Sequence, residues 1–536
     1  MLSAVVDTYH NYATLTADLR AYADAHPAIC RLSSIGRSVR GRKLWALKIT
    51  DHPEVEEDEP ETRCVGMMHG DEPVGQEMMM DLVDLLLDGY GTDARLTSLV
   101  DNTEIWVVPN MNPDGLEAGR RTNARGVDLN RNFPDGSTSD LGTLFDGPRL
   151  STAGRQRETA AVMAWGAAHS FTLSATFHTG ALVASYPYDA NGNGVPDYAA
   201  APDDALFRQL ALTYASHNPP MYASRAFPQG VTNGDQWYEV YGGLQDWNYR
   251  YLGDTGITVE LSDVKKPDAS ALSTLWEDNR ESILSYLEAV NRGVRGRVTS
   301  TATGAPVYAK VTVAGNAHAV FTDPDVGDYH RLLLPGTYAV TVTAPGYAPA
   351  AVSDVVVSPD GTARLDVSLT PDGSAGPPAP ARPDLVTAVA GRPPASVPAS
   401  GRGRVGVRVR NIGTRPVDQS VSVDLFASAD EMLDGADAAV ATATVRLKLK
   451  PGRSKSVRLT FTSPQRLAEQ PYHLLAVVDR GGAVVEADET NNVAASAGVV
   501  RISPGFMDLA ATLPAVPPAA LGTEADATAA DATAAV

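Results

Sequence analysis

The sequence predicts a mixed α/β domain, with a central sheet flanked by helices, followed by two all-β sandwich domains. Helical and strand-like segments alternate over residues 1–293. Short segments with alternating apolar and polar residues then fill residues 294–370 and 384–502, as is typical of β-sandwiches. A length of 536 residues supports several domains, because one hydrophobic core stops growing at roughly 250–300 residues.

The first region contains recognisable helices and strands. Residues 14–25 have helical spacing, and residues 78–87 form a helix whose methionines are expected to pack in the core. Residues 272–290 place apolar side chains on one helical face, and we expect this helix to stop at Gly293, acting as a C-cap. The α/β domain is expected to end there. Strands are expected at 45–49 and 105–108.

The two β regions are separated by a linker and followed by a polar tail. Alternation predicts strands at 297–299, 310–313, 338–342, 405–409, 421–425 and 457–461. Residues 371–383 are rich in Pro, Gly and Ala, which predicts a linker between the sandwiches. Residues 503–536 contain few large apolar side chains, so we expect this tail to be disordered.

The composition excludes several classes of protein. Asp and Glu outnumber Lys and Arg by 64 to 44, and the net charge of −20 repels phosphate backbones, so nucleic acid is not an expected partner. No apolar run approaches the roughly 20 residues that span a bilayer. Cys30 and Cys64 are too few for a disulfide scaffold, and the sequence leaves open whether they pair.

Two histidines and a glutamate have the arrangement of an open zinc site. His69 and Glu72 stand three residues apart after a short apolar segment, and His178 ends a strand-like run more than 100 residues later. Two ligands close in sequence and one distant ligand, with water in the fourth position, build many catalytic zinc sites. Taken singly, the pair is more often structural, and His178 alone is equally typical of a core histidine.

Three further sequence motifs make the interpretation as a zinc site more specific. These are residues 119–134, 232–249 and 258–261, and with the histidine motifs they resemble, in order and spacing, the zinc carboxypeptidases over about residues 8–293. The likeness is strongest to the subfamily that contains carboxypeptidases N, E, M and D. It implies that His69, Glu72 and His178 bind one zinc ion. Asp128 would then orient a zinc-binding imidazole by a hydrogen bond, without binding the metal itself.

The resemblance also assigns residues that hold the substrate. In this family an Asn-Arg pair binds the terminal carboxylate, and Asn130 and Arg131 stand at the matching place, where the planar guanidinium suits a carboxylate. A second arginine polarises the scissile carbonyl, and Arg121 has the required spacing. Arg120 and Arg125 lie nearby and stay open as alternatives.

The catalytic glutamate of the family corresponds to Glu260, in an apolar strand-like segment. The tyrosine that closes over the substrate lies 22 residues earlier, which selects Tyr238 over Tyr241 and Tyr249. The implied chemistry is hydrolysis of the C-terminal peptide bond. Zinc lowers the pKa of its bound water, Glu260 removes the proton and later protonates the leaving amine.

The resemblance also implies specificity for a basic last residue. Asp189 lies eleven residues after His178, at the position of the acid that receives Lys or Arg in the basic-specific members, and Gln245 matches its supporting glutamine. An unpaired buried acid costs several kcal/mol, so a cationic side chain is favoured. Residues 189–194 also look like the start of a calcium loop, although Ala200 occupies the twelfth position, where such loops have an acid.

The β regions carry resemblances of their own. Residues 322–338 resemble the transthyretin-like domain that follows the catalytic unit in the same subfamily. Residues 383–500 resemble immunoglobulin-like adhesion-related repeats of bacterial surface and secreted proteins. Neither region shows a catalytic cluster in its sequence, so we expect spacers, or attachment to a carbohydrate or a cell surface.

These domains favour a secreted protein, although the first seven residues lack the features of a signal peptide. We therefore expect a removed signal, with a cytoplasmic protein as the alternative. Peptide or protein C-termini are the expected substrates, and the oligomeric state stays open. Two other hypotheses remain, a peptidoglycan stem-peptide carboxypeptidase and a non-catalytic, metal-free binding protein of the same fold.

Overall fold

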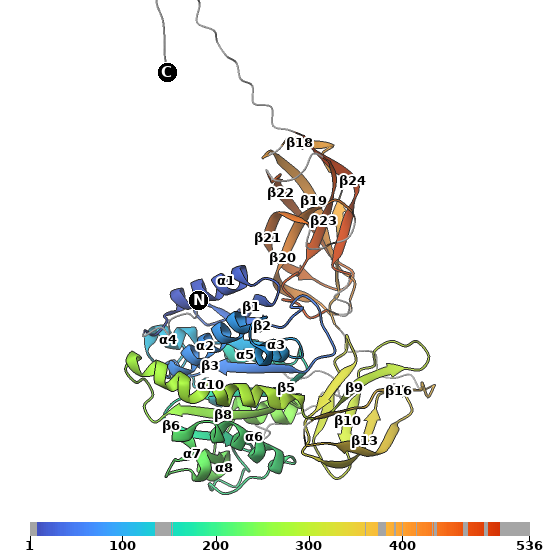
Figure 1. Cartoon of the computed structure of the whole chain (residues 1–536). Helices are drawn as coiled ribbons and strands as arrows, with labels where there is room; N and C mark the ends of the chain where they lie inside the picture. Colours follow the sequence, from blue (N-terminus) through green and yellow to red (C-terminus); the bar gives the residue numbers. More distant parts are fainter. Residues whose placement is uncertain are drawn as a thin grey trace, which may run out of the picture.

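A computed structural model of the chain describes residues 8–134, 152, 154–359, 361–373, 382–390, 393–398, 400–413, 415–430, 433, 437–464, 470–486 and 491–503. An α/β domain is followed by two all-β domains, the second of which lies above the α/β domain in Figure 1. The predicted tail lies outside the described residues from 504 on, as do residues 374–381 of the predicted linker. None of the described helices is long and apolar enough to cross a membrane.

The α/β domain is built on one mixed sheet of eight strands. Its strands, in spatial order, are β1 (Cys30–Arg37), β2 (Lys43–Ile49), β4 (Glu104–Val108), β3 (Glu61–Gly66), β5 (Phe171–His178), β8 (Thr255–Ser262), β6 (Ala181–Tyr186) and β7 (Val231–Asn233). The four central strands β4, β3, β5 and β8 run parallel, while β2 and β6 pair antiparallel with them. Strands β3, β4 and β5 are buried along their whole length, because helices cover both faces.

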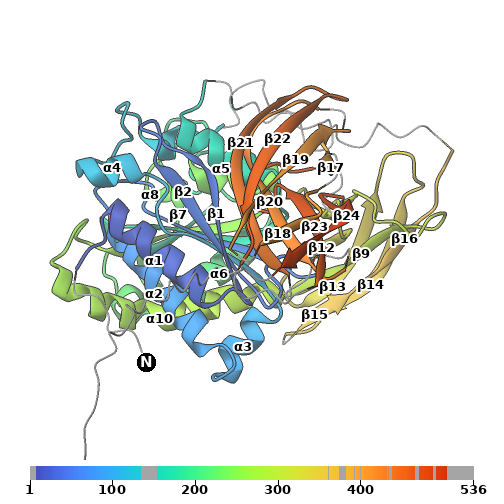
Figure 2. The same cartoon turned by 90° about the horizontal axis from the view of Figure 1, so that it is seen from above.

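Helices flank the sheet on both sides. One face packs against α1 (Tyr12–Ala25), α2 (Val74–Gly89), α3 (Ala94–Val100), α6 (Asp204–Ser216) and α10 (Leu272–Glu288). The other face packs against α5 (Arg157–Gly166) and α9 (Leu244–Trp247), which is followed by a π-helical turn, η4 (Asn248–Leu252). Figure 2 shows α1, α2 and α10 on one side of β1 and β2, with α5 on the other. The remaining short helices are α4 (Pro113–Ala118), α7 (Pro219–Tyr222), α8 (Gly234–Trp237) and the 3₁₀ turns η1 (Leu129–Arg131), η3 (Pro228–Gly230), η5 (Ala269–Ala271) and η6 (Ala289–Asn291).

The two cysteines are unpaired. Cys30 lies in β1 and Cys64 lies in β3, with β2 and β4 between these strands, and both residues are buried. Burial raises the pKa of both thiols to about 12, so they behave as small apolar side chains.

The predicted end of the last helix is wrong. Helix α10 ends at Glu288 and passes into the 3₁₀ turn η6, so Gly293 is not its C-cap. Gly293 is instead the first residue of β9 (Gly293–Ser300), with a φ of +105°. A Cβ atom here would stand 2.2 Å from the carbonyl oxygen of Arg331, so the position requires glycine.

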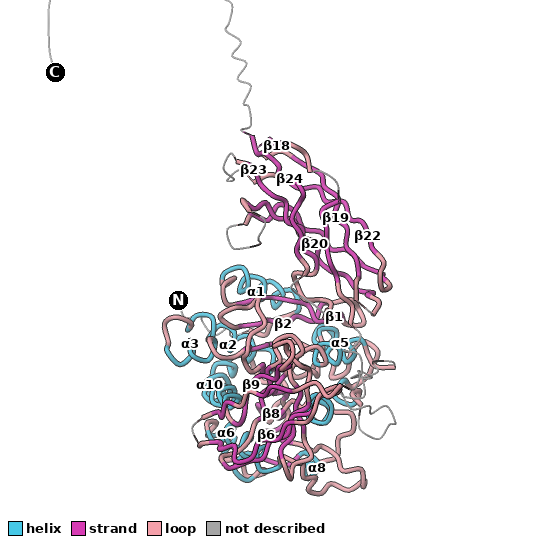
Figure 3. The backbone as a smooth tube through the Cα atoms, turned by 90° about the vertical axis from the view of Figure 1, so that its right-hand side faces the viewer, coloured by secondary structure: helices cyan, strands magenta, loops and turns pink. Residues whose placement is uncertain are grey.

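The predicted all-β domains are confirmed. Strands β9, β10 (Lys310–Val313), β11 (Ala319–Phe321), β12 (Asp328–Arg331), β13 (Gly336–Thr343), β14 (Ala350–Val357), β15 (Thr362–Arg364) and β16 (Val367–Leu369) enclose one core. A second core lies between two sheets, formed by β17 (Leu385–Ala390), β18 (Ser396–Pro398), β19 (Arg402–Asn411), β20 (Val417–Ser428), β21 (Ala438–Leu449), β22 (Ser454–Thr462), β23 (Pro471–Val478) and β24 (Val493–Ser503). Figure 3 shows this last domain in profile.

A buried polar contact joins the α/β domain to the first β domain. Asp203 accepts hydrogen bonds from the Arg331 guanidinium at 2.8 Å, from Asn316 Nδ2 at 2.6 Å and from the Tyr249 hydroxyl at 2.7 Å. The ring of His318 stacks on that of Tyr249, with centroids 3.9 Å apart. Burial opposes ionisation of Asp203, but the Arg331 guanidinium outweighs it and lowers the pKa of Asp203.

This contact predicts strong coupling between the two domains. Asp203→Ala leaves the guanidinium of Arg331 buried without its carboxylate, so the free energy of unfolding should fall by about 3–5 kcal/mol. Because the pKa of Asp203 is lowered in the folded state, its contribution is complete above its ordinary value of 3.8 and is lost as the pH falls further. Urea unfolding of the full chain measures both effects.

The matched control is Asp418→Ala, which removes an exposed ion pair with Arg446 and should cost less than about 1 kcal/mol. Equal losses in the two variants would contradict the structural role of the buried pair.

Candidate active site

The candidate site lies where neighbouring parallel strands end. His69 and Glu72 follow the carboxyl end of β3, His178 is the last residue of β5, and Glu260 is next to His178 in register on β8. Ligands bind at the carboxyl ends of strands in such sheets because the loops there converge. The loop after β3 is tight, since a Cβ on Gly70 would stand 2.1 Å from the backbone of Gly115.

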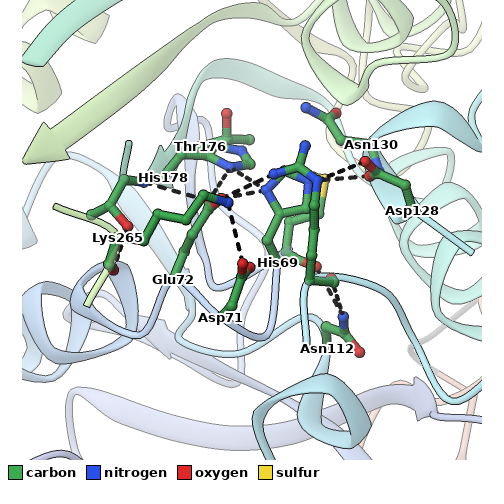
Figure 4. A network of polar contacts seen from close by, with 12 residues as sticks. His69, Asp71, Glu72, Asn112, Asp128, Asn130, Thr176, His178 and Lys265 are labelled. Carbon is green, nitrogen blue, oxygen red and sulfur yellow. Dashed lines mark hydrogen bonds and ion pairs between the residues drawn. The ribbon is translucent and has the colours of Figure 1, made fainter. Parts of the chain in front are cut away.

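Three atoms with lone pairs converge at this edge of the sheet. Nδ1 of His69 lies 3.0 Å from a carboxylate oxygen of Glu72, Nδ1 of His178 lies 3.1 Å from the same oxygen, and the two nitrogens are 3.1 Å apart (Figure 4). All three side chains are at least 97% buried. Two ligands of a tetrahedral zinc ion lie about 3.3–3.6 Å apart, so the arrangement fits zinc after a small expansion.

Asp128 fixes the orientation of His69. Its carboxylate lies 3.1 Å from Nε2 of His69, which leaves Nδ1 turned towards Glu72 and His178. A carboxylate that receives the other N–H of an imidazole is a usual companion of a metal ligand. Burial opposes protonation of His69, but hydrogen bonds to Asp128 and Glu72 raise its pKa; burial lowers the pKa of His178.

The second oxygen of Glu72 is held by two cations. Arg121 Nη1 lies 3.0 Å from this oxygen and Lys265 Nζ lies 2.8 Å from it, while Arg121 Nε also bonds Asp128 at 3.0 Å. Arg120 and Arg125 are exposed, so of the three candidate arginines only Arg121 lines the cleft. The sequence analysis missed Lys265, because a lysine in a loop after a strand carries no signal in its spacing.

Glu260 faces this cluster from β8. Burial, followed by the charge of Glu72, raises the pKa of Glu260 to about 8. Its Oε2 atom is buried and has no hydrogen-bond partner among the described residues. A carboxyl group whose pKa lies near neutral pH, beside a candidate metal centre, has the properties of a general base.

A buried acid lies at the end of the same cleft. Asp189 is 8% exposed, and Gln245 Nε2 donates to its carboxylate at 2.8 Å. Its backbone N–H donates to Asp246, a contact that the sequence analysis also missed. Burial, followed by the charge of Asp246, raises the pKa of Asp189 well above its ordinary value. A cationic group entering the cleft would stabilise the ionised form.

The two residues predicted to bind the terminal carboxylate and the tyrosine predicted to close over the substrate differ in their relation to the cleft. Asn130 lines it, and the Asn130 side-chain oxygen accepts a hydrogen bond from the backbone N–H of Leu244 at 3.0 Å. Arg131 is exposed, and its Nη1 donates to the backbone oxygen of Asn130. Tyr238 lines the cleft and is 40% exposed, and its pKa is raised by burial and then by Glu260.

The cleft has a volume of about 190 Å³ and is bounded by residues from five separate segments of the chain. Eight of the predicted site residues line it, namely His69, Glu72, Arg121, Asn130, His178, Asp189, Tyr238 and Glu260. Gln245 lies behind Asp189, and Asp128 lies behind His69.

Three family models match the chain in succession. The zinc carboxypeptidase model matches residues 15–282, the carboxypeptidase regulatory-like domain matches residues 293–370, and the CARDB model matches residues 382–496. These matches confirm the predicted order of a carboxypeptidase-like, a transthyretin-like and an adhesion-related domain.

Curated relatives carry related names. Carboxypeptidase D of Anas platyrhynchos is 41% identical over 68% of this chain and 27% of its own length, so the chain matches about a quarter of that protein. Carboxypeptidase M of Mus musculus is 40% identical over 65% of this chain and 80% of its own. The human carboxypeptidase N catalytic chain is 39% identical over 67% of this chain and 85% of its own. By the match over half its length and by these relatives, the chain belongs to the zinc carboxypeptidase family.

Proposed function

We propose that this protein hydrolyses the C-terminal peptide bond of peptides and proteins that end in lysine or arginine. The observation that carries the proposal is the convergence of His69, Glu72 and His178 beside Glu260, an acid whose pKa is raised to about 8. Membership of the zinc carboxypeptidase family supports a peptide hydrolase. The buried acid Asp189 supports a basic last residue.

His69, Glu72 and His178 would hold a single zinc ion. Two imidazole nitrogens and one carboxylate oxygen are a donor set that zinc takes in catalytic sites with an open position. When bound, zinc supplies Lewis acidity that polarises the scissile carbonyl and acidifies water. Asp128 keeps His69 in the tautomer that this binding requires.

The protein's own groups then move the proton and stabilise charge. Glu260 accepts a proton from the attacking water and returns it to the leaving amine, a double role that suits a pKa near neutrality. Arg121 lies beside Glu72 and would donate to the oxygen that becomes negative. Exclusion of water from the buried triad strengthens both interactions.

The rest of the cleft would position the last residue of the substrate. Asn130 and Arg131 would bind the terminal carboxylate, and the exposed ring of Tyr238 would fold over it. Asp189, held by Gln245, would receive the ammonium or guanidinium group. We further propose that the three domains span residues 1–293, 294–370 and 384–502. We also propose that the protein is exported and attached to a surface through its two β domains.

Glu260→Gln tests the chemical step. The amide cannot accept the proton, so kcat for release of a C-terminal arginine should fall by about 100-fold or more while peptide binding persists. The release assay is accompanied by zinc analysis, because an unchanged zinc content separates lost chemistry from lost metal. Glu277→Gln, an exposed glutamate on α10, is the control. Wild-type turnover in Glu260→Gln would overturn the mechanism.

His178→Ala tests the metal centre. Removal of one ligand should weaken zinc binding by more than about 100-fold, since even residues that merely support ligands change affinity by about 10–100-fold. Zinc per chain is measured after dialysis by elemental analysis, with the exposed His217→Ala as control. Equal zinc in the two variants would exclude His178 as a ligand.

Asp189→Asn tests specificity and stability together. The kcat/KM ratio for peptides ending in Arg over Leu should fall by at least about 100-fold. The melting temperature should not fall, because the raised pKa makes ionised Asp189 destabilising. This cost begins when the pH exceeds 3.8, the ordinary pKa of Asp189, and grows until the pH passes the raised pKa of the folded state. The stability of Asp189→Asn relative to the unchanged protein should therefore be greatest at high pH.

The same assay separates the alternative substrates. A muropeptide ending in diaminopimelate is compared with a peptide ending in arginine, and faster release from the muropeptide would favour the peptidoglycan stem peptide. An inactive, zinc-free chain would favour a binding protein of the same fold.

A further inference from the structure

The loop that follows Asp189 has the oxygen pattern of a calcium-binding loop, but it lacks usable acidic ligands at the first and twelfth positions. Counted from Asp189, Asn191 and Asn193 take the third and fifth positions, whose side-chain oxygens bind the ion in such loops, and Asp197 takes the ninth, which often binds it through a water molecule. Gly194 takes the sixth, where a glycine makes the sharp turn, and its φ is +78°. The first position is unsuited, because Asp189 is buried against Gln245 in the cleft, and the twelfth is an alanine.

An acid from a distant part of the chain lies beneath this loop. Asp235, the second residue of α8, has no exposed surface, and neither of its carboxylate oxygens has a hydrogen-bond partner in the part of the chain that the structure describes. Burial, followed by the charges of Glu239 and Asp197, raises the pKa of Asp235, and the nearby backbone of Asn191 and Asp197 offsets only part of that rise. Its segment is bonded to both ends of the loop, since the Asp235 N–H donates to the carbonyl of Tyr188 and the Ala199 N–H donates to the side-chain oxygen of Asn233, so Asp235 lies against the loop.

Two further acids make contacts in the same loop. Glu239 accepts a hydrogen bond from the backbone N–H of Gly194 at 3.0 Å, so its carboxylate reaches the loop. The carboxylate of Asp197 contacts the side-chain amides of Asn191 and Asn193. None of the ion pairs formed by the described residues involves Asp197, Asp235 or Glu239. Three carboxylates thus border this loop without a paired cation among the described residues, one of them buried, and a bound ion would draw together oxygens that are not all within 4.8 Å of one another.

We propose that Asn191, Asn193, Asp197, Asp235 and Glu239 form a binding site for one calcium ion. Asp235 and Glu239 replace the two missing end positions of the loop. The donors are carboxylate and amide oxygens only, which suits a hard cation that takes six to eight oxygen ligands. Zinc is not favoured here, because no histidine or cysteine takes part.

The ion would act on the shape of the catalytic cleft. It would join the loop after Asp189 to the segment 234–239, which carries Trp237 and Tyr238 in the wall of the cleft. The present contacts between these segments include the backbone bond from Asp235 N–H to the carbonyl of Tyr188 at 2.9 Å. Calcium would hold the pocket for the last side chain and the tyrosine beside it in one arrangement.

Calorimetric titration with calcium chloride tests the site in the full chain loaded with zinc. We expect one calcium ion to bind per chain and to raise the melting temperature, with magnesium failing to compete. Terbium should report the same site, because Trp237 lies two residues from Asp235 and can sensitise its luminescence, which calcium should then quench. Asp197→Asn and Asp235→Asn should each weaken binding at least about tenfold, since ligand charge sets affinity.

Asp24→Asn is the matched control, because it removes the same charge from an exposed position on α1. Asp197 is exposed, so its variant tests the site even if Asp235→Asn does not fold. Heat below detection at millimolar calcium, or equal affinity in Asp197→Asn and Asp24→Asn, would overturn the proposal. Zinc content and peptidase activity are measured separately, so failure of this site leaves the proposed hydrolysis untouched.

Discussion

The convergence of two imidazole nitrogens and one carboxylate oxygen within about 3 Å is the constraint around which the α/β domain is arranged. Three electron-rich atoms buried so closely repel each other or compete for one proton unless a cation joins them. The sheet brings them together because β3, β5 and β8 are parallel neighbours whose carboxyl ends share one edge. The glycine at position 70 lets the first loop close tightly enough to complete the set.

Buried acids with raised pKa values follow from this arrangement. Glu260 and Asp189 both lie in the wall of one small cleft, and burial makes the charged form of each costly. In the proposed function, this cost makes Glu260 a base that works near neutral pH and makes the pocket at Asp189 favour a cation. Asp235 lies outside the cleft, and its buried carboxylate also has no hydrogen-bond partner among the described residues. In the proposed calcium site, the metal ion would be the cation that stabilises its charge.

Fixed spacing in the sequence pointed to candidate site residues, most of which the fold brings together in one cleft. His69 and Glu72 stand three apart, and Asn130, Arg131 and Glu260 occur in ordered blocks, so a family pattern identifies them without any coordinates. Lys265, Asp246 and Asp235 were missed, because their importance depends on contacts made across the fold rather than on neighbours in sequence. The alternation of apolar residues likewise predicted the strands of both β domains, since it reflects a sheet with one buried face.

The boundary at the end of α10 shows the limit of such patterns. Glycine after an apolar helix suggests a C-cap, yet Gly293 is required by the close approach of β12, which no local pattern encodes. The loop after Asp189 shows a similar limit, because the calcium-loop pattern in the sequence began at Asp189, whereas the fold places Asp189 in the cleft and brings Asp235 against the loop.

Anomalous diffraction at the zinc absorption edge, on crystals of the full chain, tests the central claim most directly. The account predicts one strong peak at about 2.0–2.2 Å from Nδ1 of His69, Nδ1 of His178 and a carboxylate oxygen of Glu72. A zinc-supplemented crystal with no peak there, or with its only peak elsewhere in the chain, would contradict it.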